Sequence, residues 1–312
     1  MKDLRSRLAW VSQPRFKTGI RWLIIGAVLY FLTRTLHNHW QEVAQIRIER
    51  AGWASLAIAT GITLFAHMFT GYVWTWILQE LRQPVSGAWG VQVYLKTNLA
   101  KYLPGNVWHF YGRVSAAKKT GIAVEVATLS VLLEPLLMVA AASTVGLVSF
   151  SQLDIHRFAP LVQVVLLIGT LSVVHPRVLN VLLQQVAKLK KTSLNSAPTR
   201  IRRYPILPLL GEVGFLLLRS LGFIATFLAI APARVDQFPL LVGSFTWAWL
   251  MGFIIPGLPG GVGIFEVTAI AILGQHFPPA QVLSTVALYR LVNTLAETLG
   301  AGLVIIDERR QL

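Results

Sequence analysis

The sequence contains no cysteine among its 312 residues. Disulfide bonds, thiolate nucleophiles and thiolate metal sites are therefore excluded. Short enzyme motifs are missing as well, since there is no Walker loop and no HExxH, DxD or GxSxG sequence. His37 and His39 are too sparse for a metal site. These absences argue against soluble-enzyme chemistry, and neither a metal nor a cofactor is predicted.

Charged residues are scarce. They make up 13% of the chain, whereas 54% is hydrophobic and the mean hydropathy is +0.61. A soluble domain carries about 25% charged residues, so the composition predicts an integral protein of the cell (plasma or inner) membrane. Acidic residues are the scarcer kind, at 13 against 28 basic ones, which gives a net charge of +15. The bases lie mostly between apolar runs, as in cytoplasmic loops that face anionic lipids, so no nucleic-acid partner is predicted.

The apolar runs predict an all-α polytopic membrane protein with about six to eight full spans in one domain, residues 1–312. Residues 1–21 hold six bases and one acid and lack a signal-peptide cleavage site, which places the N-terminus in the cytoplasm. The C-terminus is expected there too. Residues 176–205 contain no acid and form the expected cytoplasmic loop between two pseudo-repeats, at about 53–175 and 206–306.

Two Pro-Gly breaks interrupt apolar segments, one within Lys101–Arg113 and one within Leu258–Glu266. Five residues of the first segment recur 155 positions later without a gap: Leu103, Pro104, Gly105, Val107 and Phe110 match Leu258, Pro259, Gly260, Val262 and Phe265. Irregular backbone at membrane depth must line a cavity or pack against protein, because unpaired amides are costly in lipid. Matching breaks in two halves are typical of a transporter's substrate site. Two unrelated helix-breaking turns are the alternative.

The halves are expected to be inverted repeats, each with one re-entrant helical hairpin. Counted from a cytoplasmic N-terminus, three spans separate the hairpins, so one opens inside and the other outside. The first arm, about residues 86–102, would be roughly 25 Å long as a helix. That length is close to the hydrocarbon thickness, so fully spanning arms remain an alternative.

Ionisable residues within spans cost at least ~2.5–3.5 kcal/mol each at the bilayer centre and usually mark function. No catalytic residue is predicted. The predicted substrate-binding or translocation residues are Lys101, Asn106, His109, Arg113, Glu134, Arg219, Gly260, Gly261, Glu266, Arg290 and Glu297.

The second hairpin is suited to an anion. Its glycines allow close backbone approach, and a helix that starts near Gly261 would offer free N–H groups and the positive end of its dipole. Asn106 could cap the matching helix of the first hairpin. With the four predicted cations nearby, we expect a cationic cavity for a phosphate-bearing headgroup. The carboxylates Glu134, Glu266 and Glu297 would balance its charge or carry protons.

A structural interpretation is left open for the same residues. Arg219 could pair with Glu212, and Arg290 with Glu297 or Glu134, as links between helices. Arg113 could instead snorkel to the interface.

The two broken segments resemble the lysylphosphatidylglycerol synthase transmembrane family. The first matches the family's pattern at Leu103, Pro104, Gly105, Gly112 and Arg113, and the second at Pro259, Gly260, Gly261, Gly263 and Glu266. Arg290 is similar to the family's arginine on the last span. The resemblance covers nearly the whole chain. It implies a multi-span domain of the kind that, in the full synthase, flips aminoacylated phosphatidylglycerol between leaflets.

Related stand-alone members are associated with hopanoid and polyprenyl-linked lipid pathways. The chain ends at Leu312, so the soluble aminoacyl-transferase domain is expected to be absent and synthase activity is not expected. The leading hypothesis is a flippase-like lipid translocase rather than an enzyme. The alternatives are an accessory or catalytic subunit of a lipid-modifying pathway, which transfers a glycosyl, aminoacyl or prenyl-phosphate group, and a non-catalytic scaffold. Expected partners are membrane lipids with an anionic headgroup or a polyprenyl phosphate, a second copy of the chain, or a lipid-synthesis enzyme.

The cytoplasmic position of the basic loop can be tested with a single cysteine, because the chain has no other. We expect Ser196→Cys to resist a membrane-impermeant thiol reagent in intact cells and to react after lysis. Labelling in intact cells would reverse the orientation.

Overall fold

The computed structural model describes residues 37, 41, 47–103, 107–150, 159–181, 201, 203–255, 261 and 263–310. The apolar run after the basic N-terminus predicts a first span at about residues 22–36. This span and most of the basic loop lie outside the described residues. Every regular element within them is helical. The all-α prediction is therefore confirmed for the described part of the chain.

The helices follow the predicted apolar runs to within a few residues at most ends. Their bounds are α4 Arg50–Glu80, α5 Gly87–Asn98, η1 Leu99–Tyr102, α6 Trp108–Lys119, α7 Val124–Phe150, α8 Ala159–Val173, α10 Ile206–Leu228, η2 Val235–Gln237, α11 Phe238–Ile254, α12 Ile264–Leu273 and α13 Pro279–Arg310.

Four helical segments of the described part are long and apolar enough to cross a membrane. They are α4, α7, α10 and the continuous run of η2 and α11. The last helix, α13, has 32 residues but is more polar, with a mean hydropathy lowered by Arg290, Glu297 and its charged end. The number of spans thus stays a prediction, because the segment before residue 47 is not described beyond residues 37 and 41.

The order of helices repeats along the chain. The starts of α4 and α10, at Arg50 and Ile206, are separated by 156 residues. The starts of α6 and α12, at Trp108 and Ile264, differ by 156, and those of α7 and α13, at Val124 and Pro279, by 155. α5 and α11 occupy the corresponding place before the two breaks. The offset found in the two motifs therefore extends to whole helices.

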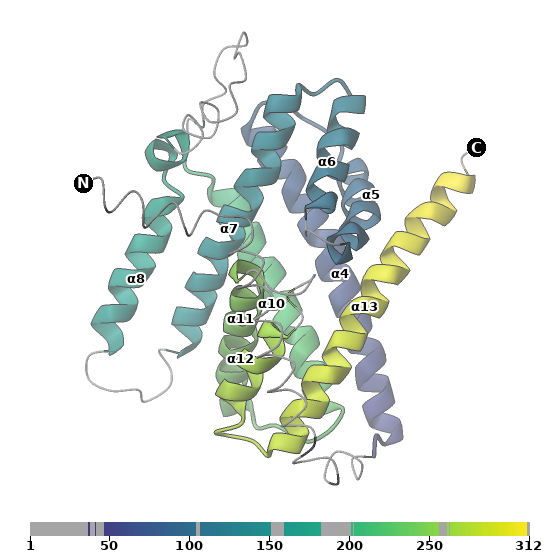
Figure 1. The fold of residues 1–312 in the computed structure, drawn as a ribbon, viewed down its shortest axis with the longest axis vertical. Helices are drawn as coiled ribbons and strands as arrows, with labels where there is room; N and C mark the ends of the chain where they lie inside the picture. Colours follow the sequence, from purple (N-terminus) through teal and green to yellow (C-terminus); the bar gives the residue numbers. More distant parts are fainter. Residues whose placement is uncertain are drawn as a thin grey trace, which may run out of the picture.

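The two helix pairs that flank the breaks occupy different ends of the bundle. In Figure 1, α5 and α6 lie in the upper part, while α11 and α12 lie in the lower part. α5 packs against α6, and α11 packs against α12.

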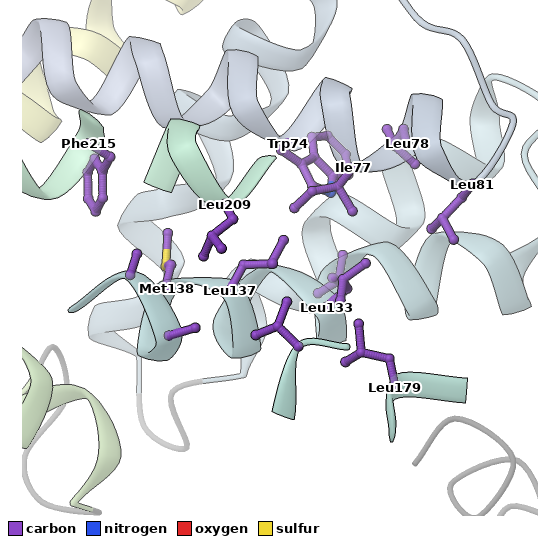
Figure 2. Packing of buried hydrophobic residues seen from close by; sticks show 14 of the residues in the cluster. Trp74, Ile77, Leu78, Leu81, Leu133, Leu137, Met138, Leu179, Leu209 and Phe215 are labelled. Atoms are coloured by element: carbon purple, nitrogen blue, oxygen red, sulfur yellow. The ribbon is translucent and has the colours of Figure 1, made fainter. Parts of the chain in front are cut away.

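The larger hydrophobic core joins α4, α7 and α10. Figure 2 shows Trp74 and Ile77 of α4 above Leu133 and Leu137 of α7, with Leu209 of α10 between them. Trp74 also donates its indole N–H to the Ser130 hydroxyl at 3.2 Å, so its polar edge is satisfied inside the core. A second core, with six aromatic side chains among its 19 buried residues, lies around α10, α11, α12 and α13 and includes Leu56 and Ala59 of α4.

The two repeat-related helices α4 and α10 make the most extensive helix contact in the described structure. Small residues permit their close approach, as is common between membrane helices. A Cβ atom added at Gly222 of α10 would lie 2.6 Å from the Thr63 hydroxyl and 3.4 Å from the Ala59 carbonyl oxygen of α4. A side chain at Gly222 therefore cannot fit without separating the helices.

We expect Gly222→Leu to lower the apparent melting temperature in detergent by several degrees, because overpacking a helix contact costs about 1–3 kcal/mol. Gly61→Leu on α4 is the matched control, since a Cβ there meets no atom within 4 Å. Equal stability of the two variants would show that the α4–α10 contact is looser than described.

Candidate functional site

Within the described residues, charged side chains inside the bundle form three groups, each centred on a carboxylate. We call them the central network (His67, Lys101, Arg219, Asn293 and Glu297), the second-hairpin pair (Glu266 and Arg290) and the buried triad (Arg113, Glu134 and Glu212). They bring together residues from α4, η1, α6, α7, α10, α12 and α13.

Glu297 of α13 is the hub of the central network. Its Oε1 atom accepts a hydrogen bond from the Lys101 ammonium at 2.5 Å and from the Asn293 amide at 3.0 Å. The His67 Nε2 atom lies 3.2 Å from the same oxygen. Lys101 belongs to η1, immediately before the first break, so this carboxylate ties the first hairpin to α4 and α13.

Arg219 of α10 completes the central network from the opposite side. Its Nε atom donates to the Tyr289 hydroxyl at 2.8 Å, and its Nη1 atom lies 3.1 Å from His67 Nε2. The guanidinium also lies over the rings of Phe215, Phe245 and Tyr289 at 5.6–5.9 Å. Arg219 forms no ion pair with a carboxylate within the part of the chain that the structure describes. Aromatic faces and neutral hydrogen-bond partners stabilise it instead.

The second-hairpin pair sits at the start of α12. The Glu266 Oε2 atom accepts a hydrogen bond from the Gly263 backbone N–H at 2.5 Å, which caps the helix. Its Oε1 atom accepts from Arg290 of α13 at 2.7 Å. Arg290 also donates to the Gly261 carbonyl at 3.3 Å. The N-terminus of α12, expected to offer free N–H groups to an anion, is thus partly occupied by the chain's own carboxylate.

Glycine is required where the arms of the second hairpin meet. Gly261 has φ +69°, and a Cβ atom there would lie 2.7 Å from the carbonyl oxygen of Gly252 in α11. Gly263, at φ +89°, caps α12. A side chain at Gly261 would meet both backbone strain and a steric clash. These positions hold the Gly261 carbonyl where Arg290 binds it.

The buried triad joins α6, α7 and α10. Arg113 of α6 forms an ion pair with Glu134 of α7, and both side chains are only 2% exposed. The guanidinium stacks on Tyr94 at 4.1 Å from the ring centroid, between Trp74 and Phe110. Arg113 therefore does not snorkel to an interface. The pair is enclosed by aromatic side chains.

Glu212 of α10 is the third member of the triad. Its side chain is fully buried, and neither carboxyl oxygen has a hydrogen-bond partner among the described residues. The charged groups that interact with it are Glu134 and Arg113. The carboxyl groups of Glu134 and Glu212 thus both lie near the Arg113 guanidinium.

The structure brings most of the predicted site residues into these groups. Lys101, Arg219 and Glu297 meet in the central network, and Gly261, Glu266 and Arg290 meet at the second hairpin. His109 is buried beside Phe110. Its Nδ1 atom has no partner within the described segments. Asn106 and Gly260 lie outside the described residues. The expectation that Arg113 would join the other three cations is not met in this structure, because Glu134 holds it against the aromatic residues of α4, α5 and α6.

The pairings of the structural interpretation do not occur. Arg219 does not bond to Glu212, since seven residues along a helix separate them by about 10 Å. Arg290 bonds to Glu266 rather than to Glu297 or Glu134.

Sequence reasoning missed His67, Tyr289 and Asn293 as members of the site. His67 is the one ionisable side chain in the apolar run of α4 between Trp53 and Trp76 apart from the tyrosine Tyr72. An ionisable residue in such a run is a functional candidate by default, so this signal was present. Tyr289 carries no comparable signal, because tyrosine is common at helix contacts.

Each hairpin is fastened in the same manner. In both, the helix that follows the break is joined by one ion pair to the next long helix: Arg113 of α6 to Glu134 of α7, and Glu266 of α12 to Arg290 of α13. The hairpin helix carries the arginine in the first pair and the glutamate in the second. The second pair is also less buried, because Arg290 and Glu266 are 25% and 13% exposed. The accessible pair is the one beside the glycine break.

The model of a family described as the lysylphosphatidylglycerol synthase TM region matches residues 20–300, which is most of the chain. No curated protein matches the sequence.

The two hairpin ion pairs should differ in their contribution to stability. Glu134→Gln leaves a buried guanidinium unpaired, which costs about 3–5 kcal/mol. Glu266→Gln keeps a cap for α12 and leaves Arg290 partly solvated, so we expect a smaller loss. Apparent melting temperatures of the two purified variants test this order, and a greater loss in Glu266→Gln would contradict it.

Proposed function

The chain belongs to the lysylphosphatidylglycerol synthase transmembrane family, and from this premise we propose that it is a lipid translocase of the flippase type. The cargo would be a lipid with an anionic, phosphate-bearing headgroup. The headgroup passes through the bundle while the acyl or prenyl tail stays in the lipid. The family and the apolar helices make the chain an integral membrane protein.

The observation that carries the proposal is the excess of positive charge between the two breaks. The central network and the second-hairpin pair contain the cations Lys101, Arg219 and Arg290 but only the carboxylates Glu297 and Glu266. A buried cation without a carboxylate is costly unless a ligand or an aromatic shell compensates it. One phosphodiester carries a single negative charge, which would make the site neutral.

Arg290 is the expected first contact of the phosphate. A guanidinium holds a phosphate through two parallel hydrogen bonds, and a helix N-terminus adds free N–H groups. In the resting structure Glu266 occupies both positions. We therefore expect the headgroup to displace Glu266 from Arg290 and the Gly263 N–H, so that one anion replaces another without exposing the cation.

The repeated helix order favours a two-sided mechanism. The helix pairs of the two hairpins lie toward opposite ends of the bundle (Figure 1), which is the arrangement expected of inverted repeats with re-entrant hairpins. Movement of one hairpin at a time would open the site to one leaflet and then to the other. Lys101 links the first hairpin to α13, and Glu266 links the second.

An accessory or catalytic role in lipid modification remains the alternative. Purified protein should neither transfer groups to lipid phosphates nor hydrolyse them. Robust turnover without added partners would favour the alternative over translocation.

Reconstitution in liposomes tests the proposal with fluorescent lipids: phosphatidylglycerol, a polyprenyl phosphate and zwitterionic phosphatidylcholine. We expect the protein to accelerate movement of an anionic lipid, and Arg290→Lys to slow it at least tenfold, because lysine keeps the charge but loses the bidentate geometry. Arg234→Lys is the control, since Arg234 is a surface residue that is 81% exposed. Rates equal to those of protein-free liposomes for all three lipids would reject a translocase. Equal loss in both variants would reject the role of Arg290.

A further inference from the structure

The buried triad contains a carboxyl group that the headgroup site does not use. Glu212 is fully buried, and both of its oxygens lack a hydrogen-bond partner in the described structure. The second oxygen of its neighbour Glu134 lacks one as well. An ionised carboxylate in this position would be an isolated buried charge, which proteins avoid by binding a proton or a cation.

The surroundings of Glu212 supply one positive charge for two carboxyl groups. Arg113 of α6 is committed to Glu134 of α7. α11 contributes no titratable side chain to its contact with α10. On α5, Tyr94 is buried near the triad, where its ring covers the guanidinium. The uncharged Thr70 hydroxyl of α4 lies near Glu212. It too lacks a hydrogen-bond partner of normal geometry in the described structure.

The remaining charged groups that face α10 belong to the central network. They are His67 of α4, Lys101 of η1 and Glu297 of α13, with Arg219 on α10 itself. The structure shows none of them bonded to Glu212, and Arg219 lies two helical turns away, about 10 Å along the axis. The triad therefore has a net charge of −1 when both of its carboxyl groups are ionised.

We propose that Glu212 is a proton-binding site, with Glu134 as the acceptor or electrostatic neighbour of the bound proton. A proton needs one donor and one acceptor oxygen, and the unpartnered oxygens of Glu212, Glu134 and Thr70 provide them. Protonation makes the triad neutral. Deprotonation leaves it with one negative charge.

The proton site is linked to headgroup binding, and this step rests on the proposed function. The central network and the second-hairpin pair together have an excess of one positive charge, whereas the ionised triad has one negative charge. A headgroup that reaches Arg219, about 10 Å along the axis of α10 from Glu212, repels an ionised carboxylate there and so favours its protonation. At that distance the coupling amounts to about tenfold in affinity. Anion binding and proton binding at Glu212 thus strengthen one another.

The first experiment measures stability and does not depend on transport. The apparent melting temperature of the detergent-purified protein is followed from pH 6 to pH 9. In this proposal the native protein holds a proton on Glu212, whereas a glutamate in the unfolded chain has a pKa of about 4.3. The unfolding equilibrium constant therefore rises by up to tenfold per pH unit, until the native carboxyl group releases its proton. Stability falls as the pH rises.

Glu212→Gln replaces the protonated carboxyl group with an amide of the same shape. We expect this variant to be at least as stable as the wild type at neutral pH and to lose the additional pH dependence. Glu134→Gln is the matched control, because it removes the partner of Arg113 and should destabilise the protein at every pH. If Glu212→Gln is as unstable as Glu134→Gln and keeps the wild-type slope, Glu212 is ionised and the proposal fails. Stabilisation of the wild type by sodium over N-methylglucamine at constant pH, absent in Glu212→Gln, would also overturn it in favour of a metal cation.

The second experiment tests the linkage in liposomes that contain fluorescent phosphatidylglycerol. Wild-type movement should be about tenfold faster at pH 6 than at pH 8, whereas Glu212→Gln should be fast and nearly independent of pH. A wild type that moves no lipid would reject the proposed function, and the stability measurement would still decide the proton site. Lipid movement with the same pH dependence in both proteins would reject the linkage.

Discussion

The interaction on which the rest of the site depends is the contact of one carboxylate, Glu297, with Lys101, Asn293 and His67. A buried charge among apolar helices must be neutralised by its neighbours, so each partner fixes the position of its own element relative to α13. Lys101 fixes the first hairpin relative to α13, and His67 fixes α4. Through His67 the network reaches Arg219 of α10 and then Tyr289, back on α13. The connected set spans both halves of the chain.

The two hairpins are attached to the bundle with unequal strength. The first is anchored by an ion pair that aromatic rings enclose, while the second is anchored by a pair that solvent or lipid headgroups can reach. The first hairpin is therefore the more rigidly attached of the two. Ligand binding at the exposed ion pair would move the second hairpin relative to the rest of the bundle. The close packing of Gly222 against Thr63 keeps α4 and α10 together.

The helices and their order could be predicted from the sequence because each apolar run has the length of a helix and each break contains proline and glycine. Lys101, Glu266 and Arg290 could be identified because charge within an apolar segment is rare. The pairings could not be predicted. Helical spacing places Glu212 and Arg219 on one face, but it says nothing of the side chains that neighbouring helices contribute, and His67 and Tyr289 reach Arg219 first. The position of Arg113 depends on the aromatic rings of three separate helices, which no local pattern brings together.

The single nitrogen of His67 that faces both Arg219 and Glu297 has a consequence for how the site rests. Nε2 either carries a hydrogen, which it can donate to Glu297 or Asn293, or offers a lone pair, which can accept from Arg219. It cannot do both at once. One side of the network is therefore always short of a hydrogen bond, and the two arrangements exclude one another. A ligand that supplies an acceptor to Arg219 would leave the imidazole free to donate to the Glu297 carboxylate. The hydrogen bond that the network gains in this way would add to the affinity for the ligand.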